Sequence, residues 1–150
     1  MFQQELENVS GYAALSNEFT WGPGDGTFPQ TVNDHFNEVN LPEPGHGVYI
    51  VRARNEARPV LYVGSNGKVG QNGTWTGGQN LPQRLCAGRG ANARVTADEW
   101  AGGLADGGSL VIQYAILCVP TVLAPATAES RLLQAYLAQY AQLPAGNGRF

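Results

Sequence analysis

The sequence predicts an α+β fold in which helices flank a small mixed or antiparallel sheet of about three strands. Two short β-branched stretches at residues 47–54 and 60–64 are separated by a turn, which is typical of an antiparallel hairpin. A third apolar stretch at residues 109–119 predicts another strand, and an Ala- and Leu-rich stretch at residues 126–142 predicts a helix. A short helix is expected between the hairpin and the third strand. The order is therefore hairpin, helix, strand, helix, which indicates the α+β class.

The first strand alternates in side-chain character. Tyr49 and Val51 fall on one face, and Ile50 and Arg52 on the other, because successive strand residues point to opposite sides. The second strand is short and β-branched and ends at Gly64.

The short helix is expected at residues 80–88. Asn80 suits its N-cap, Pro82 its first turn and Gly88 its end, so that Arg84 would lie in the first turn. The polar, Gly-rich segment that precedes it, residues 65–79, is interpreted as a long insertion.

The beginning of the chain carries weaker signals. We expect a short helix within residues 1–20, followed by a loop over residues 21–30. The apolar positions that suggest the helix are Leu6, Val9, Tyr12, Ala13 and Leu15.

The charge distribution divides the chain, although its length of 150 residues predicts a single domain. Residues 1–46 contain seven acidic residues and no Lys or Arg, so this acidic N-terminal extension carries −7. Residues 47–150 hold all nine basic residues against five acidic ones, a balance of +4. Such asymmetry suggests nucleic-acid binding, although an ordinary solvated surface would also account for it.

Several classes of protein are disfavoured. No stretch approaches the roughly 18 apolar residues of a membrane helix, and the N-terminus does not resemble a signal peptide. Cys86 and Cys118 are isolated in apolar surroundings and are interpreted as reduced, buried thiols. These features predict a cytoplasmic protein without a membrane partner.

A motif spans the hairpin. Gly47-Val48-Tyr49 lies in the first strand and Tyr62-Val63-Gly64 in the second, and Arg84, Glu129 and Asn147 follow in order. This series resembles the signature of the GIY-YIG nuclease superfamily over residues 47–147, and is most similar to its small type II restriction endonucleases. Residues 1–46 lie outside the resemblance.

The resemblance implies a role for each of five residues. Tyr62 would help to deprotonate the attacking water, and Tyr49 would shape the site. Positive charge near Tyr62 would favour its phenolate form, and Lys68 and Arg84 are the available cations. Arg84 would also hold the scissile phosphate with its planar donor fork. Glu129 would bind a single Mg²⁺ or Mn²⁺ ion.

The residues also support plainer interpretations. Tyr49 and Tyr62 can be core tyrosines, and Arg84 a surface arginine. Glu129 can be a solvated residue near a helix N-terminus, but its position beside an apolar stripe predicts that it has a partner. The stripe consists of Leu132, Leu133, Tyr136 and Tyr140.

The sequence departs from the family pattern after Arg84. Many members have a histidine or tyrosine four residues later, where this chain has Gly88. Arg89 is adjacent but is not a general base, so that role would fall on Tyr62 assisted by Lys68. Arg89 and Asn147 are further candidate substrate contacts, and Asn147 is alternatively the family's structural asparagine or a simple loop residue.

Two other site types are rejected. Gly64 to Lys68 has too few residues between its glycines for a phosphate-binding loop, and Val69 replaces the required Ser or Thr. Two histidines without a spaced cysteine pair do not support a zinc site.

The resemblance therefore implies a Mg²⁺-dependent endonuclease that hydrolyses phosphodiester bonds in DNA, as a monomer or homodimer. RNA stays open as a substrate. The alternatives are a toxin or defence nuclease of relaxed specificity, and a catalytically silent nucleic-acid-binding adaptor. We further expect the acidic extension to pack away from the cleft through Trp21, Phe28 and Phe36, rather than to cover Arg84 and Lys68 as an inhibitory mimic.

Overall fold

The computed structural model describes residues 2–10, 17–117 and 122–148. In chain order the main elements are α1 (Phe2–Ser10), β1 (Asn17–Trp21), α2 (Phe28–Asn37), β2 (Gly47–Ala53), β3 (Val60–Asn66), β4 (Lys68–Val69), β5 (Trp75–Gly77), α3 (Leu81–Cys86), α4 (Ala97–Ala105), β6 (Leu110–Ile116) and α5 (Pro125–Tyr140). Short 3-10 turns lie at Pro23–Asp25 and Ala91–Ala93.

The central sheet has four strands in the order β1-β6-β2-β3, and every pairing is antiparallel. The α+β class is confirmed, as are the β2–β3 hairpin and the later strand. The sheet has one strand more than expected, because β1 pairs along β6 from Asn17 opposite Tyr114 to Trp21 opposite Leu110.

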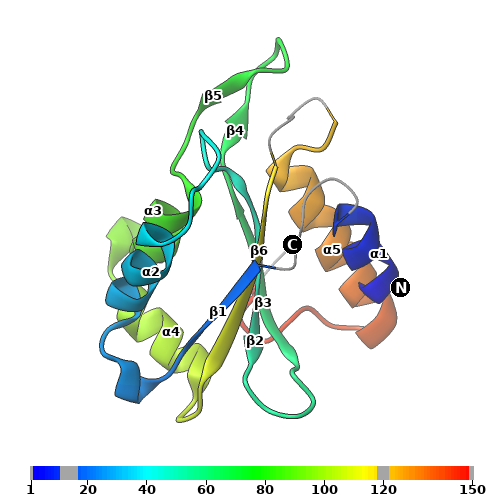
Figure 1. Cartoon of the computed structure of the whole chain (residues 1–150). Helices are drawn as coiled ribbons and strands as arrows, with labels where there is room; N and C mark the ends of the chain where they lie inside the picture. Colours follow the sequence, from blue (N-terminus) through cyan, green and yellow to red (C-terminus); the bar gives the residue numbers. More distant parts are fainter. Residues whose placement is uncertain (1, 11–16, 118–121, 149–150) are drawn as a thin grey trace.

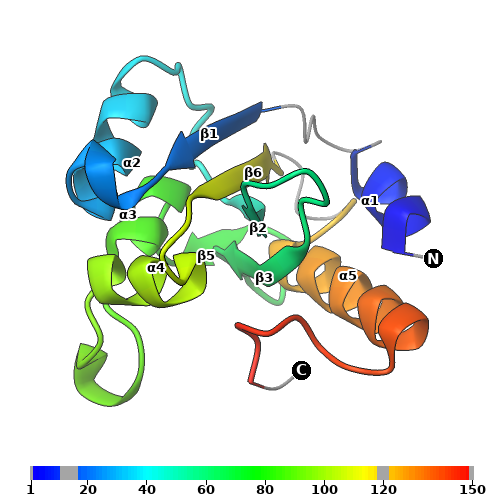
Figure 2. The same ribbon diagram turned by 90° about the horizontal axis from the view of Figure 1, so that it is seen from below.

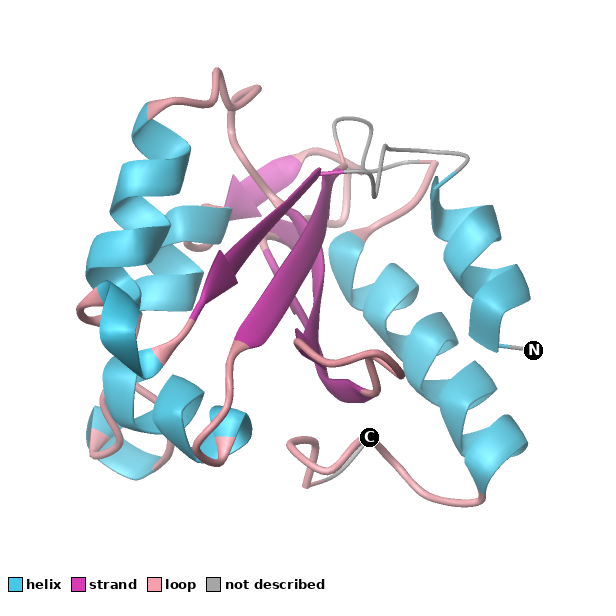
Figure 3. Cartoon of the chain, turned by 60° about the horizontal axis from the view of Figure 1, so that its bottom comes forward, coloured by secondary structure: helices cyan, strands magenta, loops and turns pink. Residues whose placement is uncertain are grey.

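Helices cover both faces of the sheet (Figures 1 and 3). Helices α2, α3 and α4 lie on one face, and α1 and α5 lie on the other (Figure 2). Each face has its own apolar core, because strand side chains alternate between the two sides. Tyr49 and Val51 enter the first core and Val48 and Ile50 the second.

The acidic N-terminal segment is built into this sheet and both helical layers. Its first helix is shorter than the expected stretch, and Tyr12, Ala13 and Leu15 lie outside the described residues. Strand β1 and helix α2 were not expected; the Gly/Pro signals at residues 21–30 correspond only to the turn between them. Helix α2 begins at a capping box, in which Thr27 and Gln30 bond to each other's backbone amides.

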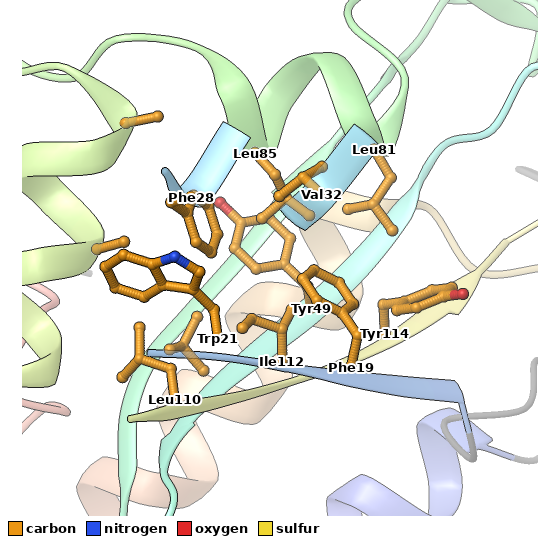
Figure 4. Close-up of a cluster of buried hydrophobic side chains, with 13 residues drawn as sticks. Phe19, Trp21, Phe28, Val32, Tyr49, Leu81, Leu85, Leu110, Ile112 and Tyr114 are labelled. Atoms are coloured by element: carbon orange, nitrogen blue, oxygen red, sulfur yellow. The ribbon is translucent and has the colours of Figure 1, made fainter. Parts of the chain in front are cut away.

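The three expected aromatic anchors of this segment are confirmed as packing residues. Trp21 and Phe28 are buried, and their rings meet edge to face with centroids 5.5 Å apart (Figure 4). Phe36 is partly buried against the same core. Because β1 is hydrogen-bonded to β6, displacing this part of the segment would break the sheet.

The C-terminal helix agrees closely with the expected range, starting at Pro125 and ending at Tyr140. No helix among the described residues is long and apolar enough to cross a membrane. Cys86 is a free thiol, half-buried rather than fully buried, and burial raises its pKa. Cys118 lies outside the described residues.

Candidate functional site

The two tyrosines of the paired motif meet on one face of the hairpin. Tyr49 lies opposite Gly64 in the register of β2 and β3, and its ring lies 5.9 Å from that of Tyr62, centroid to centroid. Figure 4 shows Tyr49 pointing from the sheet into the layer of α2 and α3. Gly64 is required here, because a Cβ would lie 2.5 Å from the Tyr49 hydroxyl oxygen and 2.7 Å from the Tyr62 ring.

The Tyr49 hydroxyl is fully buried and has no hydrogen-bond partner of good geometry among the described residues. Burial raises the pKa of Tyr49 well above its ordinary range, and Tyr62 raises it further, while Arg89 and Arg84 act in the opposite direction. Tyr49 therefore keeps its proton, and its hydroxyl is a donor held beside Tyr62.

Arg89 lies beside both tyrosines. Its guanidinium carbon is 4.2 Å from the centroid of the Trp100 ring, a cation–π contact, and Nη1 donates a hydrogen bond to the Ala87 carbonyl. The Nε and Nη2 atoms are buried and have no partner among the described residues. Burial lowers the pKa of Arg89, with Tyr49 and Tyr62 opposing that effect. Arg89 thus points inward. A direct substrate contact would instead require its guanidinium to face solvent.

Trp100 joins Arg89 to the second tyrosine. Its ring meets that of Tyr62 edge to face, with centroids 5.1 Å apart. Trp100 comes from α4, which the sequence analysis missed. The Thr96 hydroxyl caps α4 by accepting from the Glu99 amide, so the Thr-x-x-Glu spacing was an available signal for this helix.

Arg84 lies on α3, the helix that packs over the face of the sheet from which Tyr49 points. The Asn80 cap and the early proline of this helix are confirmed, but the helix has only six residues and Arg84 lies in its last turn, not its first. A phosphate bound at Arg84 would therefore depend on the guanidinium and not on the free amides of the first turn. Its charge acts on both Tyr49 and Glu129.

Glu129 reaches the site from the other face. Burial raises the pKa of Glu129, while hydrogen bonds from the Ser65 side chain and backbone and the charge of Arg84 oppose that effect. Ser65 follows Tyr62 by three positions on β3, so their side chains point to opposite faces of the strand. The candidate residues therefore lie on both faces of β3, with Tyr62 on one face and Ser65 and Glu129 on the other. Strand β3 is an edge strand of the sheet.

The site offers one carboxylate ligand among the described residues, at Glu129, and not a metal site built from several protein side chains. No group of three or more His, Cys, Asp or Glu side chains that could hold a metal occurs in the described part of the chain. One half-buried carboxylate at Glu129 is the sort of ligand that Mg²⁺ takes, because this ion usually keeps several waters and uses phosphate oxygens. Arg84 makes no ion pair with it within 4.0 Å in the described structure, where the recorded pairs are Arg58 with Glu18 and Arg131 with Glu5.

Two candidate residues lie elsewhere. Lys68 begins β4, beyond the end of the strand that carries Tyr62, and its side chain is exposed. The Asn147 side chain is engaged by the backbone of Val63, accepting from its amide and donating to its carbonyl, both at 2.9 Å. Asn147 therefore binds the C-terminal segment to the open edge of β3, which agrees with the structural alternative and not with substrate contact.

Comparisons of this chain with family models, with curated proteins and with solved structures find no match to any of them.

Proposed function

We propose that this protein is a divalent-metal-dependent nuclease that hydrolyses phosphodiester bonds in DNA, with its active site at the β3 edge. One observation carries the proposal. Tyr62, Arg84 and Glu129 come from a strand and two helices far apart in sequence, yet Tyr62 packs against Tyr49, and the charge of Arg84 acts on both Tyr49 and Glu129.

The types of residue suit phosphodiester hydrolysis. Arg84 offers planar donors to the oxygens of a scissile phosphate and offsets the negative charge that develops there. Tyr62 would accept a proton from the attacking water at its phenolate oxygen. Tyr49 stays protonated beside it and can donate a hydrogen bond to that oxygen, which stabilises the phenolate form.

Glu129 would hold the metal ion, with Ser65 orienting its carboxylate. When bound, such an ion supplies Lewis-acid stabilisation of the phosphate and lowers the pKa of water. Partial burial of this carboxylate is consistent with a functional role, because removing a charge from water has a cost that Ser65 and Arg84 only oppose.

Arg89 lies next to the position at which many family members have a histidine or tyrosine. It occupies the position after Gly88, and its inward guanidinium places a fixed positive charge next to both tyrosines. Since it does not titrate near neutral pH, its contribution is electrostatic support of Tyr62 and not proton transfer.

Supercoiled plasmid DNA with and without Mg²⁺ tests the proposal directly. The wild-type protein should nick or linearise the plasmid only with the metal, and Glu129→Gln should abolish cleavage while leaving unfolding by urea unchanged or more difficult. Arg84→Lys should cut about 10²-fold more slowly or worse, because an ammonium does not reproduce the planar fork. A folded wild-type protein that binds DNA but never cuts it would instead support the adaptor alternative.

A further inference from the structure

The segment between the strand of Tyr62 and the helix of Arg84 forms an ordered projection. Strands β4 and β5 make an antiparallel ribbon, within what we call the arm, residues 67–78. Figure 1 shows the arm extending beyond the end of the central sheet, clear of both helical layers. Because the chain enters the arm from β3 and leaves it into α3, both ends of the arm lead into the candidate site.

The base of the arm is held by a buried polar cluster. Asn66, 6% exposed, accepts from the Gly47 amide at 3.2 Å and donates to the Gln79 carbonyl at 2.7 Å. His46, 3% exposed, has Nδ1 3.0 Å from the same carbonyl, and its ring lies 4.7 Å from that of Trp75. These contacts fix where the arm leaves the sheet.

Two glycines allow the close approach at this base. Gly67 has φ +97° and its Cα lies against the His46 ring, where a Cβ would clash. Gly78 has φ +95°, and a Cβ there would lie 3.1 Å from the Gly67 Cα. The arm is therefore a defined element with a rigid base, and its direction is set by packing and not by the loop alone.

The tip of the arm is ordered by its own hydrogen bonds. The Gly70 amide donates to the Thr74 carbonyl at 2.8 Å, and the Thr74 hydroxyl donates to Asn72 Oδ1 at 2.7 Å. The side chains of Lys68, Gln71 and Thr76 are exposed on the ribbon. Lys68 forms no ion pair within the described residues.

The charge of this part of the chain complements a polyanion. No acidic residue occurs between Glu56 and Asp98, although the whole protein carries −3. The same stretch holds five basic residues, which are Arg58, Lys68, Arg84, Arg89 and Arg94. In the described structure Arg58 pairs with Glu18 and Arg89 points inward, so Lys68, Arg84 and Arg94 are the cations of this stretch that a nucleic-acid backbone can meet.

We propose that the arm enters the major groove of duplex DNA and reads base edges there, so that it sets the sequence specificity of the site. The inference rests on the proposed function for the position of the scissile phosphate at Arg84. The B-DNA major groove, about 12 Å wide, admits a two-stranded ribbon, and a glutamine amide pairs well with an adenine edge. The major groove of an RNA duplex is too deep and narrow for such reading, so the arm selects DNA over double-stranded RNA.

DNA binding measured without metal tests the arm separately from cleavage. The full-length protein in EDTA is mixed with a pool of random-sequence 30-base-pair DNA duplexes, and the bound fraction is sequenced after repeated selection. Wild-type protein should enrich a motif and bind the enriched DNA at least tenfold more tightly than the RNA duplex of the same sequence. Gln71→Ala should change or blur the motif, while Gln3→Ala, an exposed glutamine of α1, should leave it unchanged.

The salt dependence of DNA binding by a Lys68 variant supplies a second, quantitative test. Lys68→Ala should reduce the slope of log K against log salt by about one while leaving the enriched motif intact, because it removes one phosphate contact. Arg54→Ala is the matched control, because Arg54 is an exposed cation that directly follows β2 outside the arm, so its loss should leave the slope unchanged.

The outcomes are distinct. Equal binding to DNA and RNA duplexes, no enriched motif, or a motif indifferent to Gln71→Ala would overturn the arm's role even if the protein cuts DNA. A motif that depends on Gln71, in a protein that never cleaves with Mg²⁺, would support the arm and refute the nuclease.

Discussion

The Tyr49 ring covers the Cα of Gly64, its partner across the β2–β3 pair, so that a Cβ at position 64 would lie 2.5 Å from the Tyr49 hydroxyl oxygen. The two halves of the paired motif thus depend on each other: the tyrosine of one occupies the space that the glycine of the other leaves open. This contact brings Tyr49 and Tyr62 together on one face.

Gly64→Ala should lower the free energy of unfolding by about 1–3 kcal/mol, because the new methyl group forces Tyr49 or the strand to shift. Urea unfolding measures the change. Gly103→Ala is the control, since nothing lies within 4 Å of its Cβ position in α4, and there alanine should stabilise the helix by up to about 1 kcal/mol. Equal stability of Gly64→Ala and wild type would show that the close packing is not rigid.

Tyr49→Phe should leave the protein as stable as wild type or more stable by roughly 1 kcal/mol, because it removes a buried hydroxyl without a well-formed hydrogen bond. Plasmid cleavage by the same preparation should fall, since Tyr62 loses its neighbouring donor. Tyr114→Phe is the matched control: its hydroxyl lies 2.9 Å from His35 Nε2, so its loss should destabilise the fold by about 1 kcal/mol. A large loss of stability in Tyr49→Phe would contradict the functional assignment.

Asn147→Asp should destabilise the protein by roughly 1–3 kcal/mol, because a carboxylate oxygen would face the Val63 carbonyl where Nδ2 now donates. Hydrogen exchange should report the effect locally, as faster exchange of the Val63 amide at the β3 edge. Asn40→Asp, at an exposed position, controls for the added charge. If Asn147 contacts substrate instead, DNA binding should weaken while the exchange of Val63 stays unchanged.

Stability should decline as the pH falls through about 6.5 because of His35. Burial lowers the pKa of His35 below its ordinary value of 6.5, with Glu38 opposing, so the unfolded chain binds the proton more readily than the folded one. The stabilisation is thus present above the unfolded pKa and is lost on acidification. Its other contacts in the described structure are the Phe19 and Phe36 rings and both the ring and the hydroxyl of Tyr114.

Urea unfolding of wild type and His35→Gln across this pH range checks the prediction. Glu129 acts with the opposite sign, because its raised pKa makes the folded state the better proton acceptor, so the comparison is made in the Glu129→Gln background. If the stability of His35→Gln declines with pH as much as that of the protein with His35, the effect belongs to another group.

The sequence by itself determined the elements with strong local signals. Alternation and β-branched residues located β2, β3 and β6, and the Asn80 cap with Pro82 located α3. The order of Tyr49, Tyr62, Arg84 and Glu129 supplied the candidate site residues, of which the fold packs the two tyrosines against each other. These features are local, so they can be read from neighbouring residues alone.

Only the tertiary structure decided how that site is supported. Strand β1 became part of the sheet because five residues pair with β6, almost a hundred positions away, and no local pattern records such a partner. Arg89 turned inward because Trp100 lies under its guanidinium, and Asn147 was engaged by Val63 because the edge of β3 has open backbone groups to satisfy. Which cation lies beside the two tyrosines, and which face each group reaches, follow from long-range packing that residue type and spacing do not specify.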